Sequence, residues 1–122
     1  MKYLGDGRLM AEAGISCARF SRFAARHGRA GAEFLAGVPG TMGGALAMNA
    51  GAFGCETWNL VEEVDLVDRG GVFHRQSAQS SAVSYRKVEN PKAHGFPAGC
   101  FRLGEASGED GAFTGAWRLD NW

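Results

Sequence analysis

A glycine-rich segment between residues 31 and 54 is the part of this sequence best suited to bind a ligand. It reads Gly31-Ala-Glu-Phe-Leu-Ala-Gly-Val-Pro-Gly-Thr-Met-Gly-Gly-Ala-Leu-Ala-Met-Asn-Ala-Gly-Ala-Phe-Gly54. Glycine accepts positive φ and lets a backbone approach a flat or anionic ligand with no Cβ in between. The turn at Pro39 and Gly40, followed by a helix that opens at Thr41, would present unpaired N–H groups to a phosphate. The residues predict a phosphate or pyrophosphate cradle, although a tight loop without a ligand explains the composition equally well.

The two commonest nucleotide-binding motifs do not fit this segment. A P-loop needs a glycine-lysine pair, and no lysine lies between Lys2 and Lys87. The dinucleotide fingerprint needs the spacing GxGxxG after a buried strand, whereas the glycines here stand at 37, 40, 43 and 44. The segment is therefore neither a P-loop nor a Rossmann turn.

The other reactive side chains do not form a recognisable site. Cys17, Cys55 and Cys100 are far apart and include no CxxC pair, which disfavours both a disulfide framework and a zinc site. The three histidines also lack ligand spacing, so we expect no metal. This cysteine usage indicates a reducing, cytoplasmic environment.

Composition excludes several classes of function. The 122 residues carry 13 basic and 13 acidic side chains, so the neutral chain has no broad electrostatic surface for nucleic acid. No apolar run approaches the roughly 20 residues that span a bilayer, so no membrane association is expected. Hydrophobic residues make up 45% of the chain, which indicates one modest folded core.

Local patterns predict a mixture of a helix and antiparallel strands. A strand is expected over residues 8–13 and a helix from a Ser16 cap to about residue 27, with Cys17, Phe20 and Ala24 on its apolar stripe. Alternation predicts strands over 60–68, 72–75 and 98–103, the first two joined by a turn at 68–71 and followed by a polar connection over 77–82. The predicted fold class is α+β.

The glycine-rich segment also resembles a known family. Residues 33–54, with Glu56 just after them and Ser84-Tyr85-Arg86 further on, are similar to the UDP-N-acetylenolpyruvoylglucosamine reductase (MurB) family. The resemblance covers roughly the first hundred residues. It implies a vanillyl-alcohol-oxidase/PCMH-type FAD-binding domain, in which helices flank an antiparallel sheet. Residues 1–103 would form part of that domain and residues 104–122 an irregular tail, with the N-terminal flavin-binding lobe and the C-terminal substrate domain absent.

The resemblance implies an activity for the complete protein. Members of this family are cytoplasmic flavoproteins in which NADPH reduces FAD, and the flavin reduces UDP-N-acetylglucosamine enolpyruvate to UDP-N-acetylmuramate for peptidoglycan synthesis. The cofactors expected here are therefore FAD, with NADPH as reductant, and the expected partner is a UDP-sugar. In such an enzyme the flavin carries the hydride, while the protein orients the substrate and stabilises developing charge.

Matching positions then imply site residues. Arg86 would be catalytic, and Tyr85 and Arg86 would bind the substrate, because a guanidinium can hold a carboxylate with two parallel hydrogen bonds. Met42 and Cys55 depart from the usual family residues. The positions that would bind FAD are Gly37, Val38, Pro39, Gly40, Thr41, Gly43, Gly44, Asn49, Ala50, Gly51 and Ala52.

Alternatives to an active enzyme remain open at this point. The family's proton-donating serine and its glutamate belong to the absent C-terminal domain, so we expect the chain to be inactive alone. It could be a non-catalytic remnant that binds flavin, or one that associates with itself through exposed apolar surface. Another flavin oxidase of the same fold is a further alternative.

Overall fold

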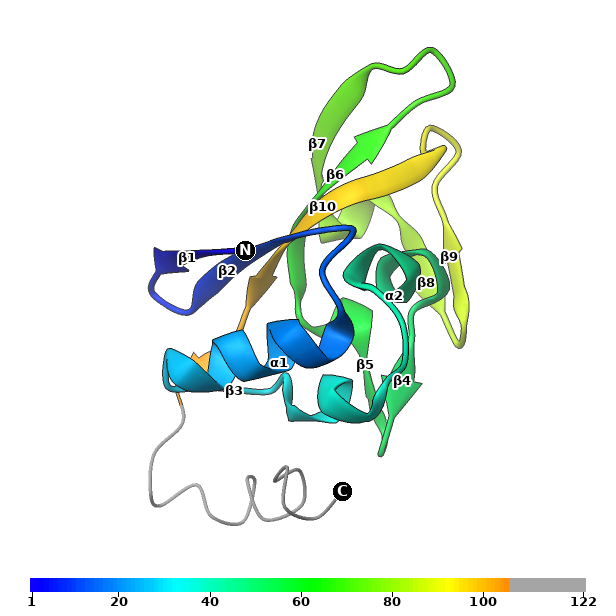
Figure 1. Ribbon diagram of the computed structural model, residues 1–122. Coiled ribbons are helices and arrows are strands. Elements are labelled where there is room, and N and C mark those ends of the chain that lie inside the picture. The colour runs from blue at the N-terminus through cyan, green and yellow to red at the C-terminus, as the bar shows by residue number, and fades with distance from the viewer. Residues whose placement is uncertain (106–122) are drawn as a thin grey trace.

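An antiparallel sheet of five strands forms the framework of the molecule, whose computed structural model describes residues 1–105. The sheet is drawn in Figure 1, with β10 at its centre, between β2 and β6. In spatial order its strands are β1 (Lys2–Gly5), β2 (Arg8–Glu12), β10 (Gly95–Arg102), β6 (Val61–Val67) and β7 (Phe73–Ser77).

Both α-helices begin directly after the residues that the sequence predicted at their N-terminal ends, Ser16 and Thr41. α1 (Cys17–Arg26) begins where the Ser16 hydroxyl accepts the N–H of Arg19 at 3.1 Å. α2 (Met42–Met48) begins in the same way at Thr41, whose hydroxyl accepts the N–H of Gly44 at 3.3 Å. A side-chain oxygen at this position satisfies an N–H that has no partner within the helix, which is why both helices begin at these residues.

The core lies between the sheet and the two helices. Phe20 of α1 packs against Phe101 of β10 with ring centroids 4.9 Å apart. A Cβ on Gly99 would lie 3.2 Å from the Leu46 side chain of α2. Since residues 99 and 101 of one strand point to the same face, both helices cover one side of the sheet. Other buried members of this core are Leu9, Ala11, Cys17, Ala24, Phe34, Leu35, Met42, Trp58, Val64 and Leu103.

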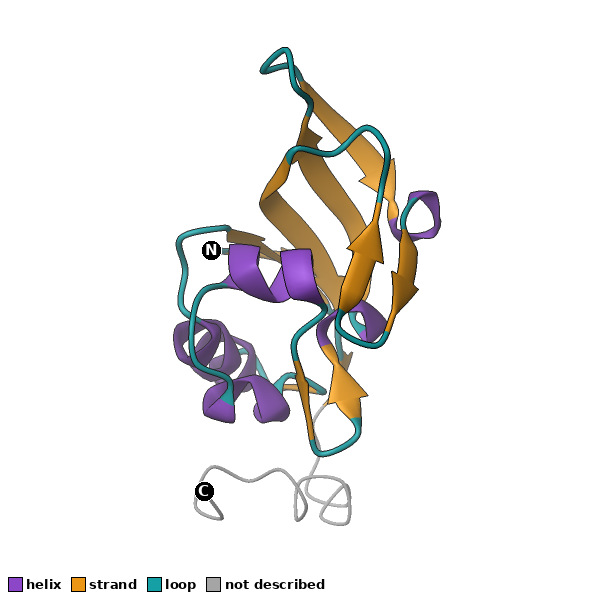
Figure 2. Ribbon diagram, turned by 90° about the vertical axis from the view of Figure 1, so that its right-hand side faces the viewer, coloured by secondary structure: helices purple, strands orange, loops and turns teal. Residues whose placement is uncertain are grey.

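Shorter elements join these parts. Three two-stranded ribbons pair β3 (Arg29–Ala30) with β11 (Gly104–Glu105), β4 (Gly51–Ala52) with β5 (Cys55–Glu56), and β8 (Ala82–Ser84) with β9 (Lys87–Glu89). Figures 1 and 2 show the β8–β9 hairpin beside α2. Three short 3₁₀ helices are η1 (Glu33–Gly37), η2 (Thr57–Asn59) and η3 (Ala78–Ser80).

The predicted α+β class with an antiparallel sheet and flanking helices is confirmed. The predicted strand over 98–103 begins earlier, at Gly95, and the polar connection over 77–82 contains η3 and the start of β8. Residues 104 and 105 of the predicted irregular tail form β11, while the rest of that tail, with Trp117 and Trp122, lies outside the described residues. Neither helix of the described part has the length and hydropathy of a membrane span.

Candidate functional site

A groove of about 320 Å³ runs along α2 and the loops on either side of it. Its walls come from the turn before the helix, from the exposed side of the helix, from the loop after it, and from the tip of the β8–β9 hairpin. The lining residues are Val38, Pro39, Gly40, Thr41, Gly44, Ala45, Met48, Ala50, Gly51 and Arg86.

A second groove adjoins the first, and the two share Gly51 and Arg86. It lies between the β4–β5 ribbon and the hairpin tip. Its lining residues are Asn49, Gly51, Ala52, Gly54, Cys55, Glu56, Tyr85 and Arg86. Arg86 therefore stands on the common wall, where one guanidinium can face ligand groups in either groove.

Two glycines, Gly40 and Gly44, line the first groove with backbone alone. Gly40 has φ +105, which L-residues rarely adopt, and a Cβ there would meet no atom within 4 Å. A Cβ on Gly44 would find its nearest atom, the Thr41 hydroxyl oxygen, at an ordinary 3.7 Å. Packing requires neither glycine, although the positive φ of Gly40 favours glycine there, and both positions leave open space on the wall of the groove.

The first turn of α2 does not supply the unpaired N–H groups that the sequence predicted, and that prediction is wrong. Met42 N–H donates to the carbonyl of Ile15 at 2.7 Å, and Gly43 N–H donates to the carbonyl of Ala13 at 3.0 Å. The N–H of Gly44 is taken by Thr41. The connection between β2 and α1 thus occupies the start of the helix. A ligand must be held by other groups of the groove.

Among the predicted cofactor positions, the structure separates those on the first groove from those off it. The ones that line it are Val38, Pro39, Gly40, Thr41, Gly44, Ala50 and Gly51. Asn49 and Ala52 border only the second groove. Gly37 and Gly43 border neither, and Gly43 instead lies against Ala13.

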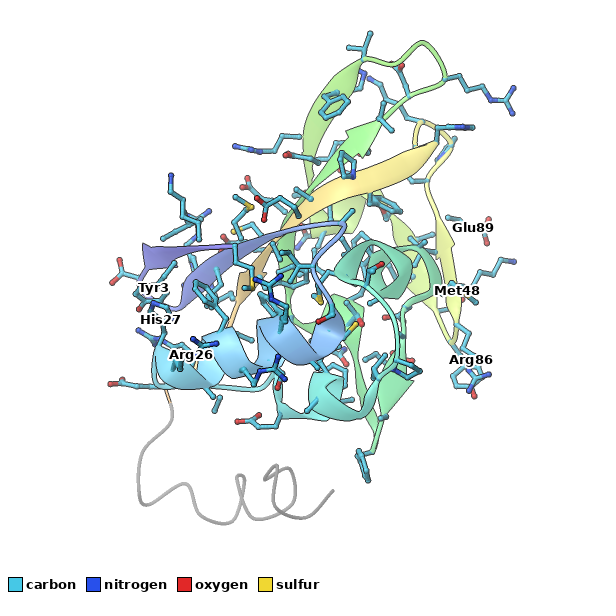
Figure 3. The ribbon with its side chains drawn as sticks, in the orientation of Figure 1. Tyr3, Arg26, His27, Met48, Arg86 and Glu89 are labelled. Atoms are coloured by element: carbon cyan, nitrogen blue, oxygen red, sulfur yellow. The ribbon has the colours of Figure 1, made fainter. Side chains whose placement is uncertain are left out.

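The predicted substrate residues lie together at the tip of the hairpin. Ser84 pairs with Lys87, so Tyr85 and Arg86 form a two-residue connection. Arg86 adopts φ +53, and its guanidinium carbon lies 5.3 Å from the centroid of the Tyr85 ring, within range of a cation–π contact. Figure 3 shows Arg86 at this tip and Met48 on the same side of the molecule.

The sequence interpretation missed several lining residues. Ala45 and Met48 border the first groove, and Gly54, Cys55 and Glu56 border the second. Met48 is 61% exposed at the end of an otherwise apolar helix, and an exposed apolar residue beside a glycine turn was a usable signal. Burial and then the nearby Glu33 raise the pKa of the Cys55 thiol, which keeps it neutral and poorly nucleophilic.

A third hollow, of about 290 Å³, lies on the opposite face of the sheet. Charged side chains from neighbouring strands line it, and they neutralise one another. Arg8 pairs with Glu63 at 3.7 Å, and Arg75 with Asp65 at 2.9 Å. Because its charges are paired within the protein, this hollow is a weaker candidate than the grooves beside α2.

Comparisons with known proteins agree on one kind of protein. Residues 4–77 match the FAD binding domain family. The chain is 55% identical over 93 residues to the UDP-N-acetylenolpyruvoylglucosamine reductase of Alkalilimnicola ehrlichii, covering 76% of this chain and 31% of that protein. It is 49% identical over 107 residues to the reductase of Methylococcus capsulatus, covering 88% of this chain and 35% of that protein.

A solved structure is similar as well. The crystal structure of UDP-N-acetylenolpyruvylglucosamine reductase (MurB) from Thermus caldophilus superposes with a TM-score of 0.70 at 32% identity, covering 84% of this chain and 38% of that one. These matches confirm the predicted resemblance and the predicted fold. The chain spans about a third of the length of the curated relatives it matches.

Proposed function

Because this chain belongs to the FAD binding domain family, we propose that the groove along α2 holds part of an FAD molecule. The observation that carries the proposal is the coincidence of the glycine-rich segment with that groove. Seven of the eleven residues predicted from the sequence to bind the cofactor line it: Val38, Pro39, Gly40, Thr41, Gly44, Ala50 and Gly51.

The residues present suit a dinucleotide. The open space beside Gly40 and Gly44 accommodates a flat or extended group at van der Waals distance. Ala45, Met48 and Ala50 supply apolar surface, as ligand grooves usually do. Arg86 supplies the positive charge that a phosphate or a carboxylate requires. The remaining predicted positions, Gly37, Gly43, Asn49 and Ala52, are proposed to support these walls.

Arg86 and Tyr85 are proposed to face the substrate from the second groove. Bound FAD would supply hydride transfer, which no side chain of this chain can provide. The chain's own residues would orient the reacting partner, and Arg86 would hold a carboxylate while negative charge builds on it. The ring of Tyr85, close to the guanidinium, would limit the conformations available to it.

We extend the proposal to the complete protein through its relatives. It would be a cytoplasmic oxidoreductase that uses NADPH and FAD to reduce the enolpyruvyl group of a UDP-sugar in peptidoglycan synthesis. Residues 1–103 would then be part of its FAD-binding domain. The similarity to named reductases over at least three quarters of this chain favours this substrate over that of another flavin oxidase.

Titration of FAD into the chain tests the proposal. Flavin fluorescence anisotropy should rise with the wild type, and Gly44→Leu should weaken binding by about tenfold, because its side chain would fill the groove. Gly14→Leu is the matched control, since a Cβ on Gly14 meets no atom within 4 Å and Gly14 borders neither groove. A folded chain that takes up no FAD, or equal weakening by both variants, would count against the groove.

A further inference from the structure

Asn49 is a buried polar residue that lies between the second groove and the core. It ends α2 in the left-handed conformation, with φ +49, and is only 1% exposed. Asparagine adopts this conformation more readily than most residues, but a glycine would serve the backbone at least as well. The conformation alone therefore does not explain a buried carboxamide.

Both ends of the carboxamide have partners in the protein. Its Nδ2 donates to the carbonyl of Ser84 at 3.1 Å, and its Oδ1 accepts the N–H of Trp58 at 3.0 Å. Trp58 in turn donates its indole N–H to the carbonyl of Leu46 at 2.7 Å. Asn49 thus connects the end of α2, the 3₁₀ helix η2 and the last residue of β8.

The bond to Ser84 reaches the hairpin one residue before its tip. Ser84 and Lys87 form the last pair of β8 and β9, and Tyr85 and Arg86 follow as the connection. The two strands of the hairpin pair with each other, and within residues 1–105 the bond from Asn49 is the one hydrogen bond that joins residues 82–89 to the rest of the protein. The side chains of β8 are exposed, so packing holds this strand weakly.

We propose that Asn49 is a positioning residue that sets the location of Arg86 at the wall shared by the two grooves. This inference rests on the proposed function for the role of Arg86 but not for the contact itself. With 1% exposure, the side chain of Asn49 has almost no surface to offer a ligand. Its effect on a ligand must pass through the hairpin.

Amide hydrogen exchange tests the contact without any ligand. Asn49→Gly keeps the left-handed backbone and removes both hydrogen bonds, so exchange of the amides in segment 82–87 should become about fivefold to tenfold faster. Asn59→Gly is the control, because Asn59 of η2 accepts the N–H of Glu56 and its side chain makes no hydrogen bond to residues 82–89. Asn49→Asp provides a second variant that retains an acceptor for Trp58.

A double-mutant cycle measured by FAD binding tests whether Asn49 affects the ligand through Arg86. Asn49→Gly and Arg86→Ala should each weaken FAD binding by a similar factor, and the double variant should bind no more weakly than Arg86→Ala alone. Unchanged exchange of segment 82–87 in Asn49→Gly and Asn49→Asp would overturn the inference, and so would fully additive losses in the cycle. If the wild type takes up no FAD, the proposed function fails, and the exchange measurement decides the contact by itself.

Discussion

Gly43 lies directly against Ala13, at a distance that leaves no room for a side chain. A Cβ built on Gly43 would be 2.7 Å from the Cβ of Ala13, and 3.2 Å from both its Cα and its carbonyl oxygen. That carbonyl accepts the N–H of Gly43 at 3.0 Å, so the close approach is also a hydrogen bond. The loop before α1 is thereby fixed to the first turn of α2, which forms one side of the groove.

Gly43→Ala should therefore destabilise the fold, while Gly44→Ala should not. The added methyl at Gly43 would push α2 away from the backbone of Ala13, which should lower the unfolding free energy by about 1–3 kcal/mol. At Gly44 the methyl has room, and alanine favours a helix over glycine by up to about 1 kcal/mol. Urea unfolding followed by circular dichroism measures both. Equal stabilities of the two variants would contradict the close packing of Gly43 on Ala13.

These adjacent glycines show what the sequence could and could not predict. Their pattern was enough to single out this segment, because glycines let a backbone approach a ligand closely, and most of the positions singled out line the groove. It did not distinguish a glycine needed for packing from one that leaves space for a ligand. That distinction depends on Ala13, which is distant in sequence and reaches Gly43 only through the fold. The prediction of free N–H groups at the start of α2 was wrong for the same reason, because their acceptors, Ala13 and Ile15, lie far away in the sequence.

The long elements were predictable and the short ribbons were not. α1 and the β6–β7 hairpin carry their own caps, periodicity and turn residues, so local reasoning found them. The hairpin β8–β9 has exposed strands of three residues each, too short for an alternation to be recognised. The hydrogen bond from Asn49 to Ser84 joins residues 35 positions apart, and no local pattern predicts it.

Low pH should weaken the fold through Glu62. This carboxylate accepts the Nε–H of Arg102 at 2.7 Å and that of Arg8 at 2.6 Å, and these two arginines lower its pKa below the ordinary 4.5. A carboxyl group with a lowered pKa stabilises the folded state above its ordinary pKa. That stability is lost as the pH falls through the lower, folded value. The unfolding free energy should therefore drop as the pH decreases below about 5.

Glu62→Gln should make this pH dependence shallower, because glutamine does not titrate. Glu89→Gln is the control, since Glu89 and its partner Lys87 are both well exposed and lie on the same short strand, β9, so that this pair joins no two strands. Denaturant unfolding at a series of pH values gives the slopes. If Glu62→Gln and the wild type lose stability in parallel between neutral and acidic pH, the ion pairs across β2, β6 and β10 do not stabilise the sheet.

Two phenylalanines should differ sharply in their contribution to stability. Phe101 is fully buried between α1 and the sheet, whereas Phe73 at the start of β7 is 65% exposed. Phe101→Ala should cost about 3–5 kcal/mol, because it removes a large apolar side chain and leaves a cavity. Phe73→Ala should change the unfolding free energy by no more than about 0.5 kcal/mol. Thermal unfolding of both variants at one protein concentration provides the comparison.

Trp58 should stabilise the fold through its indole N–H as well as through the apolar surface of its ring. The N–H donates to the carbonyl of Leu46 at 2.7 Å, and the ring packs edge-on against Phe96 with centroids 5.7 Å apart. Trp58→Phe keeps an aromatic ring in the core but leaves the carbonyl of the buried Leu46 without this donor, which should cost about 1–3 kcal/mol. Tyr85→Phe, at an exposed aromatic residue, should leave the unfolding free energy unchanged. Since the same carbonyl belongs to α2, Trp58→Phe should also speed amide exchange in that helix. Unaltered exchange there would mean that the indole hydrogen bond does not fix α2 to η2.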